Sequence, residues 1–139
     1  MARLAPAFDT SPTIAQERRA GDVAATAAKA LARIAEAWRL RNEDAARLVD
    51  VSARTWNRIK HGAWSGRLSQ DQLLRASGVI GLYKALHLYF SDDLADEWVT
   101  LRNTGPSFGG RTPLEIMIEG GLPAIMATRD HVDALRGGV

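Results

Sequence analysis

The chain has 139 residues, no cysteine and a formal net charge of +2, a length that allows one sizeable core or two small helical ones. Without cysteine there is no disulfide framework and no thiolate site, which fits a reducing cytoplasm. No apolar run approaches the roughly 18 to 20 residues that span a bilayer, and the N-terminus lacks a secretory-signal pattern, so we expect a cytoplasmic protein without membrane contact.

The charge is distributed unevenly along the chain. Residues 1–32 carry four basic and three acidic groups, residues 33–67 carry eight and four, and residues 68–139 carry six and nine. The middle segment is therefore suited to bind a polyanion, whereas the last half is not.

The first segment, residues 1–21, contains two prolines, scattered small residues and no sustained period. We expect it to form a flexible N-terminal arm. Apolar residues then recur with helical spacing and form one stripe along a helix of about five turns. This stripe consists of Ala27, Leu31, Ile34, Ala35 and Trp38.

Two short helices joined by a tight turn are predicted between residues 42 and 62. Asn42 is a good N-cap, and the two acidic residues after it suit the positive end of the helix dipole. The turn is placed at Asp50–Val51, and Ser52 caps the second helix, which ends at Gly62, a residue suited to the left-handed position after a helix. This is the outline of a helix-turn-helix.

A longer helix is predicted over residues 69–90. Ser69 and Gln72 form a capping box at its start, and the segment is apolar around most of its circumference. We therefore expect it to lie centrally or in a dimer interface. Gly78 and Gly81 each weaken such a helix by about 1 kcal/mol relative to alanine, so we expect a neighbouring backbone to approach there; a kink is the alternative.

The last third contains three more helix starts. Ser91 caps one helix. A helix of only two turns follows, begun by Thr112 at the head of a second capping box and by Pro113 at the first helical position, and stopped by Gly120–Gly121. Pro123 starts the final helix. Because no period-2 run or hairpin signal occurs, the predicted fold class is all-α, a helix-turn-helix bundle followed by a small helical C-terminal domain.

The helix that begins after Ser52 has the composition of a helix that reads DNA. Its three-residue apolar spacing turns Trp56 and Ile59 inward and leaves four polar residues outward, which are Arg54, Thr55, Asn57 and Arg58. Arginine can donate two hydrogen bonds to guanine and asparagine can pair with adenine, while threonine or lysine can hold a phosphate. The residues assigned to DNA are Ser52, Arg54, Thr55, Asn57, Arg58 and Lys60. The alternative is a basic face that is merely solvated.

The same segment resembles the Xre (phage repressor-like) helix-turn-helix. Its pattern S-x-x-T-apolar-x-R-apolar-x-x-G runs from Ser52 to Gly62, with Ala46 as the small residue where two helices cross and Val51 as the apolar residue of the turn. Trp56 is bulkier than the isoleucine or valine usual at its position. A second hypothesis is therefore a pure protein-interaction module that keeps this fold without binding DNA.

A second series of residues follows in a fixed order beyond residue 90. It consists of Trp98, Asn103, Phe108-Gly109-Gly110, Thr112 to Glu115, Gly120-Gly121 and Arg136-Gly137-Gly138. In order and spacing it resembles the Xre/MbcA/ParS-type antitoxin toxin-binding domain, the partner of RES-type toxins. With the helix-turn-helix, the resemblance covers about residues 30–138. Arg102 departs from the proline of many relatives and leaves the shape of the preceding loop open.

The resemblance implies a type II antitoxin. Its C-terminal domain would bind a cognate RES toxin, an NAD-degrading enzyme, and block the active-site entrance, while its N-terminal domain represses the shared operon. The residues so implied in toxin binding are Gly109, Gly110, Arg111, Thr112, Pro113, Glu115, Gly120, Gly121, Leu135, Arg136, Gly137, Gly138 and Val139. The alternative is that Pro113, Leu114 and the glycines simply close a small helical core.

No catalytic pattern is present in the sequence. The three histidines lie far apart and in no metal-binding spacing, and there is no nucleophile elbow and no phosphate loop. We expect no enzyme, cofactor, metal site or small-molecule substrate.

The predicted organisation is a flexible arm over residues 1–21, an Xre-like helix-turn-helix over 22–68, a central or dimerisation helix over 69–90 and a toxin-binding domain over 91–139. The expected partners are a cognate RES toxin, operator DNA, a second copy of the chain, since helix-turn-helix proteins usually read paired half-sites, and a larger toxin–antitoxin hetero-oligomer. The alternative function is a stand-alone transcription regulator whose C-terminal half only dimerises.

Overall fold

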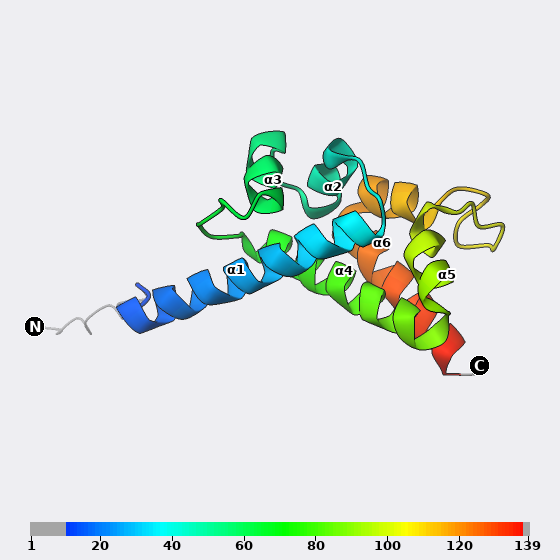
Figure 1. Ribbon diagram of the computed structural model, residues 1–139. Helices are drawn as coiled ribbons and strands as arrows, with labels where there is room; N and C mark the ends of the chain where they lie inside the picture. Colours follow the sequence, from blue (N-terminus) through cyan, green and yellow to red (C-terminus); the bar gives the residue numbers. More distant parts are fainter. Residues whose placement is uncertain (1–10, 138–139) are drawn as a thin grey trace, which may run out of the picture.

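The computed structural model describes residues 11–137, and the regular secondary structure of this part of the chain is helical, without a strand, as predicted (Figure 1). In chain order the elements are α1 (Ile14–Ala37), α2 (Asn42–Val49), α3 (Ala53–Lys60), α4 (Gln70–Tyr89), α5 (Asp92–Glu97), the 3-10 helix η1 (Trp98–Thr100) and α6 (Pro113–Arg136).

The helix α4 lies at the centre of the molecule, which confirms one of the two places expected for an apolar 69–90 helix. It packs against α1, α2, α5 and α6, and its largest interface is with α6. In Figure 1, α2 and α3 lie on one side of the crossing between α1 and α4, and α5 lies beside the C-terminal end of α4. The buried positions of α4 are Ala76, Gly78, Val79, Leu82, Ala85 and Leu86.

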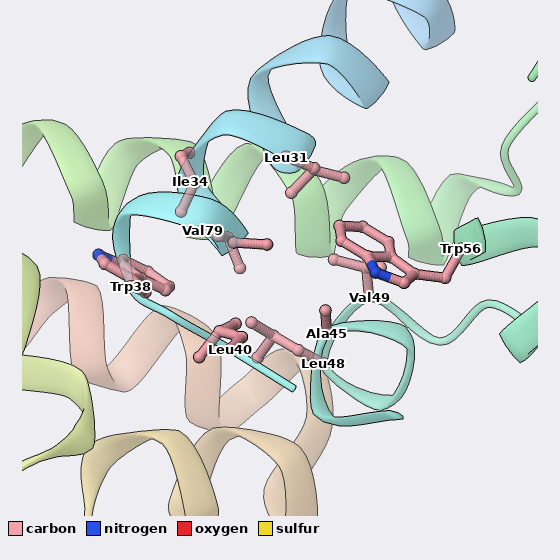
Figure 2. A pocket seen from close by; sticks show the side chains of 10 residues that line it. Leu31, Ile34, Trp38, Leu40, Ala45, Leu48, Val49, Trp56 and Val79 are labelled. Carbon is pink, nitrogen blue, oxygen red and sulfur yellow. The ribbon is translucent and has the colours of Figure 1, made fainter. Parts of the chain in front are cut away.

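The core of the N-terminal half forms where α1, α2, α3 and α4 meet (Figure 2). The indole of Trp56 from α3 and that of Trp38 at the end of α1 are both almost fully buried. Leucines and other apolar side chains surround a small internal space between them, including Leu31, Leu48 and Val79. The same buried cluster continues into the C-terminal half through Phe108, Leu114, Met117 and Ile125, so the two halves share one core.

The start of α1 differs from the predicted arm over residues 1–21. A capping box begins α1 at Ile14, because the Thr13 hydroxyl oxygen accepts from the Gln16 N–H at 3.1 Å and the Thr13 N–H donates to Gln16 Oε1 at 2.7 Å. The first turns of α1 are exposed and so carry no apolar period that could have revealed them. Residues 1–10 lie outside the described residues.

The predicted N-caps Ser52, Ser69 and Thr112 are confirmed, and Asn42 is wrong. The hydroxyl oxygens of Ser52 and Ser69 accept from the backbone N–H groups three residues on. At α2, however, Arg41 occupies the cap, and its guanidinium pairs with Glu43 at 3.1 Å and Asp44 at 3.2 Å. Asn42 is instead the first helical residue.

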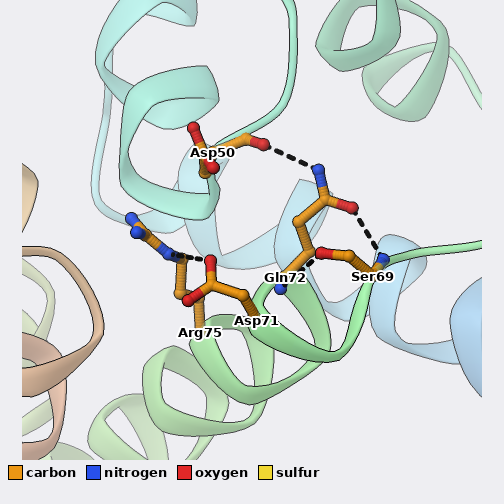
Figure 3. A network of polar contacts seen from close by, with 5 residues as sticks. All are labelled: Asp50, Ser69, Asp71, Gln72 and Arg75. Carbon is orange, nitrogen blue, oxygen red and sulfur yellow. Dashed lines mark hydrogen bonds and ion pairs between the residues drawn. The ribbon is translucent and has the colours of Figure 1, made fainter.

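A hydrogen bond ties the turn of the helix-turn-helix to the start of α4 (Figure 3). Asp50 adopts a left-handed backbone with a φ of 58°, and its carbonyl oxygen accepts from Gln72 Nε2 at 2.7 Å. The same Gln72 side chain closes the α4 capping box with Ser69 at 2.9 Å. The α2–α3 turn therefore has a fixed position on the central helix.

The helix predicted to begin at Ser91 is present as α5, without the side-chain cap that was expected. Ser91 occupies the N-cap position of α5, but its side chain makes no capping hydrogen bond. The helix continues into η1 and ends at Thr100, so Gly105 and Pro106 belong to the loop that follows it.

The helix that begins at Thr112 is interrupted after two turns, as predicted. Gly121 has a φ of 65° and a ψ of −149°, outside helical geometry, although α6 continues to Arg136. Only half of the second capping box forms, because Thr112 caps the Glu115 N–H at 3.1 Å while the Glu115 side chain bonds to Arg111 instead.

The two glycines of α4 lie where α6 packs closely on α4, in agreement with the expected close approach of a neighbouring segment, and the nearest atoms there belong to side chains of α6. A Cβ at Gly78 would lie 2.6 Å from Ile125 Cγ2, and a Cβ at Gly81 would lie 2.6 Å from the guanidinium carbon of Arg129. The glycines let α6 pack closely against α4. The side chain opposite Gly78 is the buried Ile125, which has little room to move, whereas the guanidinium opposite Gly81 is the end of a flexible side chain.

This difference predicts opposite effects for two matched substitutions. Gly78→Ala gains about 1 kcal/mol of helix propensity, but the new methyl collides with a buried isoleucine, and such overpacking costs about 1 to 3 kcal/mol. We expect a net destabilisation of up to about 2 kcal/mol. Gly81→Ala displaces only the end of a flexible arginine and should leave stability equal or higher. Urea unfolding of both variants checks this, and a Gly78→Ala protein as stable as Gly81→Ala would contradict it.

Candidate functional site

The outward face of α3 is a continuous polar surface. Trp56 and Ile59 are buried, with exposed fractions of 2% and 4%, which confirms the predicted inward pair. Arg54, Asn57 and Arg58 are exposed on the opposite side. Because the buried pair fixes the rotation of the helix, these three side chains are presented together to a partner.

The other residues assigned to DNA flank this face. The Thr55 N–H donates to Ser52 Oγ at 3.0 Å, and the two hydroxyls are hydrogen-bonded to each other at 3.0 Å, so both take part in the cap at the start of α3. Lys60 Nζ donates to Asn42 Oδ1 at 3.1 Å and thereby links the end of α3 to the start of α2. These residues lie where they can hold a backbone phosphate beside the reading face.

The C-terminal surface begins with a loop that its own hydrogen bonds close. The Gly110 N–H donates to the Asn103 carbonyl at 2.8 Å, and the Asn103 N–H donates to the Arg111 carbonyl at 3.1 Å. Gly109 and Gly110 have φ values of 58° and 82°, a region that favours glycine. The glycine pair therefore serves the turn of this loop.

Phe108 anchors the loop to the core. Its ring is 3% exposed and packs edge-to-face on Trp98 and on His131, with centroid distances of 5.8 Å and 5.1 Å. Aromatic pairs of this geometry contribute about 0.5 to 1.5 kcal/mol beyond the buried area. The loop is thus fixed both to η1 and to the second part of α6.

An exposed ion-pair network covers the first two turns of α6. Arg111 bonds to Glu119 at 2.6 Å and to Glu115 at 3.3 Å. The hydrogen bond to Glu119 raises the pKa of Arg111 and lowers the pKa of Glu119. Arg47 of α2 also lowers the pKa of Glu119, which places the helix-turn-helix beside this part of the C-terminal domain.

The residues implied in toxin binding fall into two groups. The first group surrounds the loop and the start of α6, and the second lies at the end of α6. Gly109, Glu115 and Gly120 are exposed, Gly110, Arg111, Thr112 and Gly121 are half-buried, and at the far end Leu135 is half-buried while Arg136 and Gly137 are exposed. The second part of α6 separates the groups by roughly 20 Å. Gly138 and Val139 lie outside the described residues.

Pro113 does not belong to the accessible surface. Its side chain is among the most deeply buried of the described residues, so it supports the start of α6 from within and offers no direct contact. The alternative role in closing a helical core therefore applies to Pro113 and to Leu114, which is also buried.

Sequence reasoning missed Arg75 as a residue that supports this surface. Its guanidinium bonds to Asp71 at 2.7 Å, and its Nη2 lies 3.1 Å from the position that a Cβ would take at Gly121. An arginine one turn after an aspartate on α4 signals the ion pair, but nothing in the sequence signals its contact with α6.

His87 links the end of α4 to α5. Its Nδ1 lies 3.0 Å from Asp92 Oδ1 and its Nε2 lies 2.8 Å from Asp96 Oδ1, and both ring nitrogens can donate only in the imidazolium form. Partial burial alone would lower the pKa of His87, but the hydrogen bonds to Asp92 and Asp96 outweigh it and raise the pKa above 6.5.

A raised pKa in the folded state makes stability depend on pH with a definite sign. The contribution of His87 is fully present below its unfolded pKa of about 6.5 and is lost as the pH rises through its folded pKa. We therefore expect the stability gap between wild type and His87→Gln to be largest near about pH 5.5 and to narrow toward about pH 8.5. Urea unfolding across this range measures the gap, and a gap that widens with pH would contradict the prediction.

Residues 11–137 contain neither a membrane-spanning helix nor a cluster of metal-binding side chains. No helix within residues 11–137 has the length and hydropathy needed to cross a membrane. Within these residues there is also no group of three acidic or histidine side chains that could hold a metal ion.

Comparison with known proteins identifies two domains in the chain. Residues 17–81 match the family described as Antitoxin Xre-like helix-turn-helix domain, and residues 84–138 match Antitoxin Xre/MbcA/ParS C-terminal toxin-binding domain. The chain is also 32% identical over 111 residues to Uncharacterized protein y4oB of Sinorhizobium fredii (strain NBRC 101917 / NGR234), covering 79% of this chain and 84% of the relative. No solved structure gave a significant match.

The two matched ranges meet inside α4. The helix-turn-helix domain and the toxin-binding domain are thus joined through one continuous central helix. The order of the two matched domains and the all-α fold agree with the resemblance seen in the sequence. The chain belongs to the Xre/MbcA/ParS-type antitoxins of toxin–antitoxin systems.

Proposed function

We propose that this antitoxin neutralises a RES-type, NAD-degrading toxin by covering the entrance of its active site, and that it represses its own operon through α3. The observation that carries the proposal is that a polar helix-turn-helix face and a matched toxin-binding domain share one core. The α3 face with Arg54, Asn57 and Arg58 is supported by α1 and α2, and α6 of the matched toxin-binding domain packs on the central helix α4.

The toxin-binding part of the proposal is supported by the rigid attachment of the Asn103–Arg111 loop to the core. A surface that must fill an opening benefits from being rigid before binding, since less conformational entropy is then lost. The Asn103–Arg111 loop is closed by backbone hydrogen bonds, and Phe108 fixes it to the core. The chain should therefore co-purify with the product of the neighbouring gene, and separate elution of the two proteins on a sizing column would count against the pairing.

The homodimer and the larger hetero-oligomer remain proposals. They are supported by the paired half-sites that helix-turn-helix proteins usually read. The dimerisation surface is proposed on α4, where Leu74, Leu88 and Tyr89 remain exposed. Light scattering of the chain alone and of its complex gives both stoichiometries.

The DNA-binding part predicts a specific role for Arg58. Arg58→Ala should weaken operator binding by about 1 to 3 kcal/mol, the usual contribution of an arginine that contacts a base, and should leave toxin neutralisation unchanged. The matched control is Arg102→Ala, which removes the same charge from an exposed position far along the chain. Gel-shift titration with the promoter duplex measures both, and equal affinities for the two variants would remove Arg58 from the reading helix.

A further inference from the structure

A basic groove runs between α1 and α3, beside the reading face. Its floor includes the buried side chains of Trp56 and Ile59. Its rim carries four cations, one carboxylate and one amide, which are Lys29, Arg33, Arg39, Lys60, Glu36 and Asn42. No sequence motif singled out the three cations that α1 and its C-terminal turn contribute.

The cations lie on both edges of the groove, three on the α1 side and Lys60 on the α3 side. Lys29 and Arg33 are exposed and lie one helical turn apart on α1, about 6 Å along the axis. Lys60 is held at the other edge by its hydrogen bond to Asn42 at 3.1 Å. Because Lys60 lies on α3, the groove continues directly into the surface that presents Asn57. Glu36 offsets one of the four charges, and the groove keeps a net positive charge.

Arg39 is held in a backbone conformation that glycine would adopt more easily. It follows the C-cap of α1 with a φ of 54°, and its N–H donates to the Glu36 carbonyl at 3.0 Å. A left-handed conformation costs a residue with a side chain about 1 to 2 kcal/mol, and helices commonly place glycine at this position. Strained residues of this kind cluster at functional sites, and here the strained residue puts a guanidinium on the groove.

We propose that this groove binds backbone phosphates of operator DNA, with Lys29, Arg33 and Arg39 as positioning residues that orient α3 over the bases. The inference rests on the proposed DNA binding of α3 and adds a contact surface from α1 to it. Two cations one turn apart on α1 can meet successive phosphates of one strand, and Lys60 can meet the strand from the α3 side. Such contacts fix register and orientation and carry no sequence information.

The test separates phosphate contact from base reading. The double variant Lys29→Gln/Arg33→Gln is compared with Lys84→Gln/Arg102→Gln, which loses the same charge from exposed positions outside the groove. Binding is measured by fluorescence anisotropy at several salt concentrations, with a duplex from the promoter of this gene and a scrambled duplex of equal length. Circular dichroism confirms that both variants are folded.

The groove variant should bind both duplexes more weakly and by the same factor. Each lost phosphate contact should reduce the slope of log affinity against log salt by about 0.9, so the slope should fall by about 2, while the control variant keeps the wild-type slope. Arg39→Gly should also reduce the slope of log affinity against log salt, by the amount expected for one phosphate contact. This variant should be at least as resistant to urea as the wild type, because glycine adopts the left-handed backbone conformation without strain.

Three outcomes would overturn the inference or its basis. If Arg58→Ala weakens binding while the groove variant keeps the wild-type affinity and slope, this inference alone fails. If the groove variant loses affinity only for the promoter duplex, its residues read bases and the phosphate assignment is wrong. If the wild type binds neither duplex, the proposed DNA-binding function and this inference fail together.

Discussion

Phe108→Ala is expected to destabilise the protein by about 3 to 5 kcal/mol, the usual cost of truncating a buried phenylalanine, and to abolish toxin binding. Phe108 is the buried contact of the Asn103–Arg111 loop with Trp98 and His131. Without it, the loop loses its attachment to η1 and α6, and the toxin would have to order a mobile surface on binding. Urea unfolding and co-purification with the toxin measure the two effects.

The control for this prediction is Leu101→Ala in the neighbouring segment. Leu101 is 45% exposed, so its truncation removes little buried area. It should lower the free energy of unfolding by much less than Phe108→Ala does. DNA binding of Phe108→Ala should persist under conditions where the protein remains folded, because α3 is packed by α1, α2 and α4. A Phe108→Ala protein with wild-type stability and wild-type toxin affinity would show that the loop is not anchored in this way.

Trp56→Ala is expected to destabilise the protein by a similar amount, about 3 to 5 kcal/mol. It should impair DNA binding, whereas Phe108→Ala impairs toxin binding. Trp56 is 2% exposed and lies in the core where Leu31, Leu48 and Val79 meet (Figure 2). Its removal leaves a cavity beneath the reading face, so α3 loses its fixed rotation and DNA binding should fall sharply. Gel-shift titration and urea unfolding check the two statements.

Trp64→Ala is the matched comparison for this variant, because Trp64 is only half-buried in the loop after α3. It should be clearly less destabilising than Trp56→Ala. Since Trp56 and Phe108 belong to one buried cluster, both of their alanine variants should shift a single cooperative unfolding transition. Equal stabilities of the Trp56 and Trp64 variants, or separate transitions for the two halves, would contradict the shared core.

Local signals in the sequence were enough to predict much of the fold. Ser52 and Ser69 each cap a helix through a side chain that reaches only three residues ahead, and the spacing of Trp56 and Ile59 alone defines the buried side of α3. Such short-range chemistry does not depend on the rest of the molecule, which is why helix starts and faces could be derived before the tertiary structure.

The features that sequence reasoning missed depend on contacts between distant segments or on competing local choices. Gly78 faces Ile125, a partner that only the packing of α4 on α6 can specify. At α2, the Asn42 amide oxygen accepts from Lys60 of α3, and Arg41 stands at the N-cap position without a side-chain cap hydrogen bond, although asparagine is the usual cap. The start of α1 has a capping box but no buried stripe, so periodicity could not locate it.

For the same reason, the sequence predicted the α3 part of the candidate site better than the C-terminal part. The exposed side of α3 follows from one helix and was correctly oriented for Arg54, Asn57 and Arg58, whereas Thr55, also predicted to point outward, is half-buried. The C-terminal residues came from a resemblance that orders residues along the chain without placing them in space. The structure separates them into a loop group and an end group, and it buries Pro113, which a linear motif cannot distinguish from an exposed contact.

The most direct test of this account is an NAD-consumption assay of the purified product of the neighbouring toxin gene, with and without this chain in excess. The account predicts that the full chain reduces NAD consumption to background, that Arg58→Ala does so equally well, and that a chain lacking residues 136–139 does not. A toxin that consumes NAD at its full rate in the presence of excess full-length chain would contradict the central claim that this protein acts by covering a toxin.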